Sequence, residues 1–117
     1  MSAAMSGDGK RMYAATSTQA GASAEGIFYS VDSGYNWLVC PNTAGIDWNQ
    51  IAASNDGQTV VGVDIGEKIY ASHDGCRTWE LVGEKYGGSI ALTPDGKTIF
   101  ATNTNLNHFL DGVAKVR

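Results

Sequence analysis

The sequence contains few of the features that define several large classes of protein. Only 17% of its 117 residues are charged, and two are cysteine and two proline, whereas 43% are hydrophobic. No apolar run reaches the roughly 18–20 residues that a transmembrane helix needs, so no membrane span is expected. Eight basic residues among twelve acidic ones form no basic run, which argues against nucleic-acid binding. This composition excludes a disordered chain, and residues 1–9 lack the features of a secretory signal.

Cysteine and histidine are too few to indicate a cofactor. Cys40 and Cys76 leave a disulfide open, but two free thiols are favoured, because a small disulfide scaffold would carry more cysteines. His73 and His108 lack paired ligands at metal-binding spacing. The Asp-Gly turns described below supply one carboxylate each, fewer than a calcium loop requires. We therefore predict no cofactor and no metal.

The chain repeats itself. Three segments align without gaps: AAMSGDGKRMYAAT from residue 3, IAASNDGQTVVGVD from residue 51 and IALTPDGKTIFATN from residue 90. Each predicts a short strand, a Ser/Thr-x-Asp-Gly turn and a second strand, because Asp bonds nearby backbone and Gly accepts a positive φ. The flanking residues alternate in polarity, as strands do, and helical periodicity is absent.

A second pair of segments alternates with the first set. They are IFYSVDSGYNWLV from residue 27 and KIYASHDGCRTWELV from residue 68. Their serines and their tryptophans are both 42 residues apart, so each repeat holds four short antiparallel strands, as a β-propeller blade does. Trp37, Trp79, Tyr29 and Tyr70 are predicted to lie in the core.

We predict an all-β fold, a single repeat domain over 1–117 with about three propeller-type blades of four antiparallel strands. Blade one spans 1–40, blade two 48–82 and a partial, degenerate blade three 89–117, which ends in a stunted hairpin of 109–110 with 113–116. Closed propellers have four to eight blades, so three leave two apolar faces exposed. Head-to-tail self-association would cover them, two copies making a six-bladed ring; the alternative is a fragment of a longer chain.

Two segments resemble a known motif. Ser30-x-Asp32-x-Gly34-x-Asn36-Trp37 and Ser72-x-Asp74-x-x-x-Thr78-Trp79 are similar to the Asp box, or bacterial neuraminidase repeat, of sialidase-like and photosystem-assembly-factor-like propellers. The resemblance covers nearly all of 3–103. It implies that these segments, here called the box turns, are structural: Ser and Asp bond the turn backbone and Trp packs between blades. Cys76 stands where the motif has Gly, so the second turn is either strained or shifted by one residue.

The irregular loops predict a binding site. Alternating strands place every Asp-Gly turn and box turn at one end, the turn end, and the remaining loops at the other, the loop end. The first repeat carries six extra residues around 16–25, and the link 41–48 carries three more; binding usually resides in such loops. The candidates are Thr18, Gln19, Glu25, Asp47, Trp48, Asn49, Asp64 and Glu67. Trp48 would stack on a sugar ring or a proline; alternatively it fills the space between two blades.

The sequence offers no catalytic constellation. The sialidase resemblance would imply an arginine cluster and a tyrosine with a carboxylate partner, but the chain has three arginines, and Arg77 lies in a box turn. No pair of carboxylates stands out as acid and base. We therefore predict a non-enzymatic binding or scaffold module for a carbohydrate or protein ligand. The alternatives are a structural assembly subunit (shell, fibre or larger complex) and, more remotely, a fragment of a glycosidase-like propeller.

Overall fold

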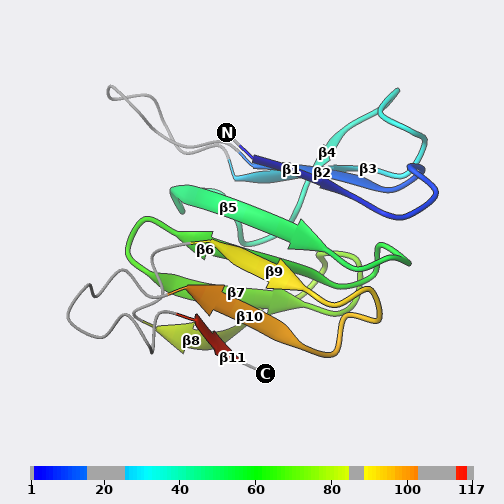
Figure 1. Cartoon of the computed structure of the whole chain (residues 1–117). Coiled ribbons are helices and arrows are strands. Elements are labelled where there is room, and N and C mark those ends of the chain that lie inside the picture. Colours follow the sequence, from blue (N-terminus) through cyan, green and yellow to red (C-terminus); the bar gives the residue numbers. More distant parts are fainter. Residues whose placement is uncertain (1, 16–25, 85–88, 103–112, 116–117) are drawn as a thin grey trace.

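The computed structural model describes residues 2–15, 26–84, 89–102 and 113–115, in which every regular element is a β-strand (Figure 1). The first sheet contains β1 (Ser2–Met5), β2 (Met12–Ala15), β3 (Ile27–Ser30) and β4 (Leu38–Val39). The second contains β5 (Trp48–Ala53), β6 (Val60–Asp64), β7 (Lys68–Ser72) and β8 (Glu80–Glu84). The third contains β9 (Ile90–Leu92), β10 (Ile99–Thr102) and β11 (Val113–Lys115). All pairings are antiparallel, which confirms the predicted all-β class. Within the described ranges, no helix is long and apolar enough to cross a membrane.

The Asp-Gly turns set the register of the first strand pair in each sheet. In the first turn Ser6 Oγ donates to the Asp8 carboxylate at 2.7 Å, and the same carboxylate accepts from Lys10 N at 3.0 Å. Gly9 has a φ of +73°, which a glycine adopts at little cost. The other two turns repeat these bonds with Ser54, Asp56, Gly57 and Gln58 and with Thr93, Asp95, Gly96 and Lys97.

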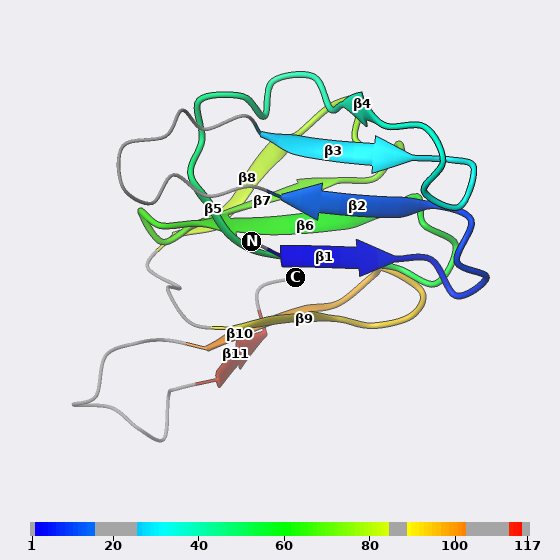
Figure 2. The same ribbon diagram turned by 90° about the horizontal axis from the view of Figure 1, so that it is seen from above.

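The core lies between sheets rather than within one. One cluster of buried side chains joins the first sheet to the second through Tyr13, Ala15, Ile27, Cys40, Trp48, Ile51, Val60 and Cys76. Another joins the second sheet to the third through Val61, Val63, Ile69, Ala71, Ile90, Ile99 and Ala101. The second sheet therefore buries both of its faces, which explains why β6 is apolar at four consecutive positions, Val60–Val63. Figures 1 and 2 show the sheets stacked in chain order.

Neighbouring sheets also touch through their turns. Gly7 N donates to the Asn55 carbonyl, and Asn55 N donates to the Pro94 carbonyl, both at 2.8 Å. These bonds link the three Asp-Gly turns in series. Within each of the first two sheets, the box turn also bonds to the Asp-Gly turn, since Ser33 N donates to the Lys10 carbonyl and Gly75 N to the Gln58 carbonyl. The predicted gathering of both turn types at one end of the molecule is thereby confirmed.

The third sheet has a strand within the segment predicted to form the final hairpin. β11 pairs with β10, with Val113 opposite Thr102 and Lys115 opposite Phe100, so it occupies the position of a third strand. The expected partner, 109–110, lies outside the described residues. The predicted hairpin of 109–110 with 113–116 therefore stays a prediction.

Candidate functional site

The two box turns have the same hydrogen-bond geometry. In the first, Ser30 Oγ accepts from Gly34 N at 2.9 Å, and the Asp32 carboxylate accepts from Asn36 N at 2.9 Å. The Trp37 indole N–H then donates to the Gly34 carbonyl at 2.9 Å. The second turn makes the corresponding bonds with Ser72, Cys76, Asp74, Thr78 and Trp79. Each serine, aspartate and tryptophan is therefore engaged in its own turn.

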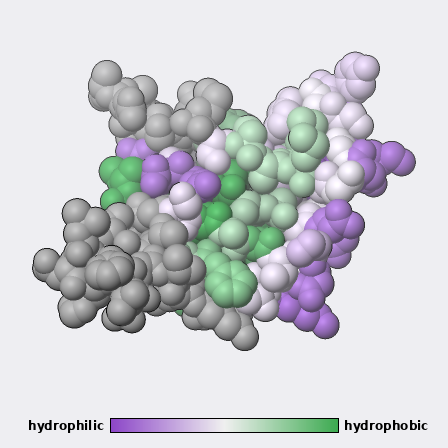
Figure 3. Space-filling view, viewed as in Figure 1, coloured by the Kyte–Doolittle hydropathy of each residue, from purple (hydrophilic) through white to green (hydrophobic). Residues whose placement is uncertain are grey.

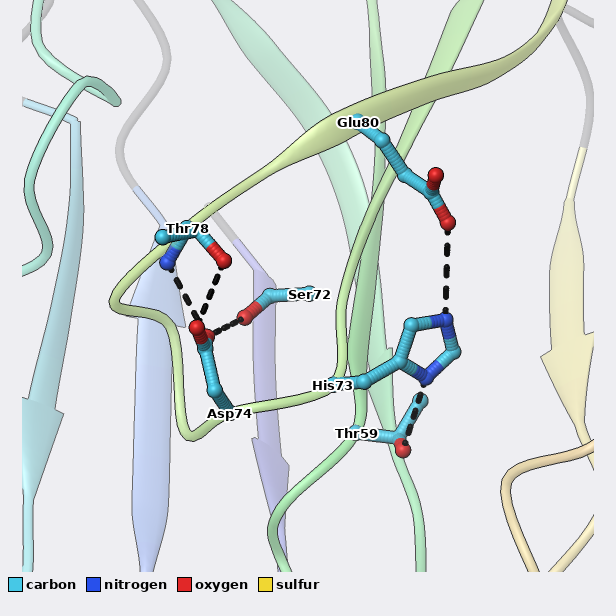
Figure 4. A network of polar contacts seen from close by, with 6 residues as sticks. All are labelled: Thr59, Ser72, His73, Asp74, Thr78 and Glu80. Carbon is cyan, nitrogen blue, oxygen red and sulfur yellow. Dashed lines mark hydrogen bonds and ion pairs between the residues drawn. The ribbon is translucent and has the colours of Figure 1, made fainter.

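The box-turn aspartates are held ionised by this geometry. Hydrogen bonds from the Asn36 side chain and backbone, and then from Ser30 Oγ, lower the pKa of Asp32 to about 2. The Thr78 hydroxyl and backbone N–H, followed by the Ser72 hydroxyl, hold the pKa of Asp74 well below its ordinary value. Figure 4 shows the Asp74 group. These shifts arise from turn bonding and do not require a catalytic role.

Cys76 occupies the glycine position of its turn without shifting the turn. Its N–H donates to Ser72 Oγ at 2.9 Å, as Gly34 N does to Ser30 Oγ. Its φ is +75°, a region that costs an L-residue about 1–2 kcal/mol. Of the two predicted alternatives, the strained turn is therefore correct.

The expectation of free thiols is wrong, because Cys40 and Cys76 form a disulfide with their Cα atoms 5.6 Å apart. It joins the end of β4 to the second box turn and so links the first sheet to the second. The prediction treated a disulfide as a substitute for a core, whereas this one links two sheets that already share a core. Stacking of the repeats brings together two residues that are 36 positions apart.

Trp48 is a core residue and is not exposed to a ligand. Its side chain is 1% exposed, and its indole N–H donates to the Thr43 carbonyl at 3.2 Å. Its ring meets the Tyr70 ring edge-on, with centroids 5.5 Å apart, and lies 5.8 Å from that of Trp79. The proposed stacking role of Trp48 is thereby wrong, and the alternative reading, a filler between two sheets, is confirmed.

Of the four other aromatic residues predicted to lie in the core, three pack against it and one is exposed. Trp79 is half-buried against the first core cluster, as are Tyr29 and Tyr70, but Trp37 is 40% exposed, so its prediction as core is wrong. Trp79 packs on Trp48, whereas the first sheet has no preceding sheet among the described residues. The two tyrosines are also not equivalent: Tyr29 pairs with Leu38, next after Trp37, but Tyr70 pairs with Leu81.

The remaining loop-end candidates are only partly described. Thr18, Gln19 and Glu25 lie outside the described residues. Asp64 pairs with Trp48 across β5 and β6, and Ile65 N donates to the Asp47 carbonyl, so these residues do gather at one end. The Asp64 carboxylate accepts from Lys68 N, and Glu67 has a φ of +67° in that turn. Asn49 is exposed at the irregularity of β5.

A groove that the sequence analysis missed lies between the first and second sheets. It has a volume of about 340 Å³, and its lining residues are Arg11, Tyr29, Val31, Leu38, Val39, Pro41, Gly75, Cys76 and Arg77. On the first-sheet side three apolar side chains are exposed: Val31 by 58%, Leu38 by 62% and Val39 by 49%. β4 is the edge strand of its sheet, so one side of its backbone is unpaired by any described strand.

Two arginines supply the charge of this groove. Arg11 is fixed by bonds from Nε to the Tyr13 hydroxyl at 2.7 Å and from Nη2 to the Gly75 carbonyl at 2.9 Å. Its guanidinium carbon lies 5.8 Å from the ring centroids of both Tyr13 and Tyr29, within cation–π range. Arg77 is exposed. No acidic residue lines the groove, in a chain whose net charge is −4.

A second depression of about 310 Å³ lies on the outer part of the second sheet and is lined by Ala71, His73, Asp74, Thr78, Trp79 and Glu80. His73 Nε2 is 3.7 Å from the Glu80 carboxylate, and His73 Nδ1 is 3.3 Å from Thr59 Oγ1 (Figure 4). Thr59 is 8% exposed, so this contact ties His73 to a largely buried residue. Within the described part of the chain, no three His, Cys, Asp or Glu side chains gather as a metal site would require.

Comparisons with known proteins identify the fold. No protein-family model and no curated protein matches the sequence. Among solved structures, a GH74 enzyme of Niastella koreensis matches 87% of this chain with a TM-score of 0.66 and 20% identity. The structure of YCF48 bound to D1 peptide matches 88% of this chain with a TM-score of 0.58 and 15% identity. A nidogen/laminin complex matches 91% of it with a TM-score of 0.63 and 16% identity.

These neighbours are β-propeller proteins, and this chain has the fold of propeller blades. It covers 14% of the GH74 chain, 32% of the YCF48 chain and 40% of the matched chain in the nidogen/laminin complex. The chain thus spans less than half the length of each structure. At these identities the likeness shows the fold alone.

Proposed function

We propose that this chain is a non-enzymatic protein-binding module of the Asp-box propeller kind, which takes an extended segment of a partner protein in the groove between its first two sheets. The observation that carries the proposal is the combination of three exposed apolar side chains on and beside β4 with two arginines and no lining acid. An apolar wall with a few fixed polar groups is typical of a binding groove.

The geometry favours a segment that carries both an apolar side chain and a carboxylate. Val31 and Leu38 would contact the apolar side chain, and Arg77 would pair with the carboxylate. β4 is an edge strand, and an extended peptide can add to such an edge through its backbone. Arg11, held by Tyr13 and Gly75, adds positive charge without having to be ordered on binding.

Two of the structural neighbours were solved with protein partners, a D1 peptide on YCF48 and laminin with nidogen. This supports protein recognition as a use of the fold. The carbohydrate alternative rested on stacking by Trp48, which is buried, and is not carried forward. The proposal leaves the His73 and Glu80 contact as a structural tie at the margin of the second sheet.

Fluorescence anisotropy with a library of short labelled peptides tests the proposal. We expect peptides with an aliphatic residue near a free carboxylate to bind, and their amidated forms to bind more weakly. Arg77→Ala should weaken binding by about tenfold, equivalent to ~1.4 kcal/mol, and added salt should weaken it further. Leu38→Ser should also weaken it, whereas Lys68→Ala, which removes an exposed cation elsewhere, should not. Binding that is equal in all three variants would contradict the groove.

A further inference from the structure

Each sheet of this chain has two faces with distinct roles. We call the face that covers the preceding sheet the leading face, and the face that the following sheet covers the trailing face. On β2, Tyr13 lies on the trailing face of the first sheet and is 0% exposed, and its repeat equivalent Val61 is 0% exposed in the second sheet. On the leading face, Ile51 of the second sheet is 4% exposed and its equivalent Ile90 of the third is 8% exposed.

The two outermost faces have the same apolar character, but no described strand covers them. In the third sheet, Phe100 is the equivalent of Tyr13 and Val61, yet it is 39% exposed; Ala91 beside it is also exposed. In the first sheet the leading face includes a row of directly paired residues that crosses all four strands, Ala3, Ala14, Phe28 and Val39. Met5, on the same face as Ala3, is 58% exposed.

The figures show the same arrangement. Figure 2 looks onto the first sheet, and no other described strand lies over it. In Figure 3 apolar colouring extends over the middle of the molecule, and hydrophilic colouring lies towards its two ends, over the larger area at the turn end. None of the seven residues named on these two faces is charged, and the one cation that the register adds to the trailing face is Lys115, opposite Phe100 on the edge strand β11.

We infer that a second copy of this chain docks head to tail, with the leading face of its first sheet on the trailing face of the third sheet. The occupant follows from the repeat. Ala3 and Ala14 on the leading face of the first sheet are the repeat equivalents of Ile51 and Gly62 in the second sheet and of Ile90 and Ala101 in the third. Those two leading faces each cover the trailing face of the preceding sheet, so the surface that fits the first is a trailing face of the same repeat. The third sheet presents such a face. The contact is heterologous and continues the existing stack of sheets.

Charged substitutions on each face test the inference. The variants are Met5→Lys on the leading face and Phe100→Lys on the trailing face, and the control is Ile65→Lys, in a turn at the loop end and 66% exposed. By sedimentation velocity at high micromolar concentration, we expect the wild type and the control to associate. Each face variant alone should sediment as a 12.3 kDa monomer. An equimolar mixture of the two should give a species of twice that mass, because each variant retains the face that the other has lost.

Several results would overturn the inference. A monomeric wild type would do so, as would association that survives in either face variant or is lost in the control. Failure of the mixture to associate would exclude the head-to-tail arrangement in favour of a symmetric contact. Circular dichroism checks that each variant is folded, and Ala3→Glu and Ala91→Glu provide a second pair if one is not. Val39 belongs to both the groove lining and the leading face, but Arg77 lies on neither face. Arg77→Ala should therefore leave association unchanged while it weakens peptide binding, so this inference and the proposed peptide groove fail separately.

Discussion

Arg11 of the first sheet donates a hydrogen bond from Nη2 to the carbonyl of Gly75 in the second box turn, 64 positions along the chain, at 2.9 Å. Its Nε also donates to the Tyr13 hydroxyl. Arg11→Lys should lower the free energy of unfolding by about 1.5–3 kcal/mol, because an ammonium cannot reproduce both bonds of the planar guanidinium. Urea denaturation measures the difference.

Arg77→Lys is the matched control, since Arg77 is exposed. Its free energy of unfolding should stay within about 0.5 kcal/mol of the wild type. Equal destabilisation by the two substitutions would show that the bond between Arg11 and Gly75 does not contribute specifically.

The disulfide and the backbone at Cys76 can be separated by two double variants. Removing the link with Cys40→Ala and Cys76→Ala should cost about 2–4 kcal/mol, because a cross-link restricts the unfolded chain. Replacing Cys76 by Gly instead should recover about 1 kcal/mol of this loss, since glycine adopts a φ of +75° without the β-carbon penalty. Thermal unfolding compares the two; an alanine variant as stable as the glycine variant would show that the turn relaxes.

The box turns predict a loss of stability in acid. The folded pKa of Asp32 is about 2, below its ordinary value of 3.8, so the ionised form stabilises the fold at neutral pH. That stabilisation should decrease as the pH falls below about 4 and vanish near 2. In Asp32→Asn the midpoint of thermal unfolding should fall less steeply over this range than in the wild type. Glu84→Gln, an exposed change on β8, should keep the wild-type slope; identical slopes for all three proteins would refute the assignment.

Gly62 makes room for Trp48. A β-carbon at Gly62 would lie 2.5 Å from Cζ3 of Trp48, which requires the indole to move. Gly62→Ala should therefore destabilise the fold by about 1–3 kcal/mol. Gly66→Ala is the control, because a β-carbon at Gly66 would lie no closer than 3.4 Å to another atom, the Asp64 carboxylate oxygen. This substitution should be neutral or slightly stabilising. Both are measured by urea denaturation.

The repeat made most of the fold predictable. Turn residues that recur at fixed spacing determine strand pairs locally, because Ser6 and Asp8, for example, bond only within their own turn. The all-β class, the strand order of the first two sheets and the gathering of the turns at one end all follow from such local bonds. The pairing of β11 with β10 could not be predicted in this way, because no Asp-Gly or box turn joins these two strands.

The site was less predictable, because it depends on how sheets stack. Trp48 was a candidate for ligand binding because its counterpart in the next repeat is Gly87, so the repeat itself does not require a tryptophan there. In the structure, the tryptophan at this position packs against Tyr70 and Trp79. The groove involves Leu38 of one sheet and Arg77 of the next, a contact that no spacing within a single repeat encodes. The disulfide was missed for the same reason.

The backbone bonds of Asn55 have a consequence for the curvature of the stack. This residue accepts from the turn before it and donates to the turn after it, so peptide groups help to fix the angle between successive sheets. Substitution by any residue except proline keeps both the N–H and the carbonyl, so the side chain at this position can vary while these bonds are maintained. The main chain at the turn end thus holds successive sheets together independently of the apolar clusters between them.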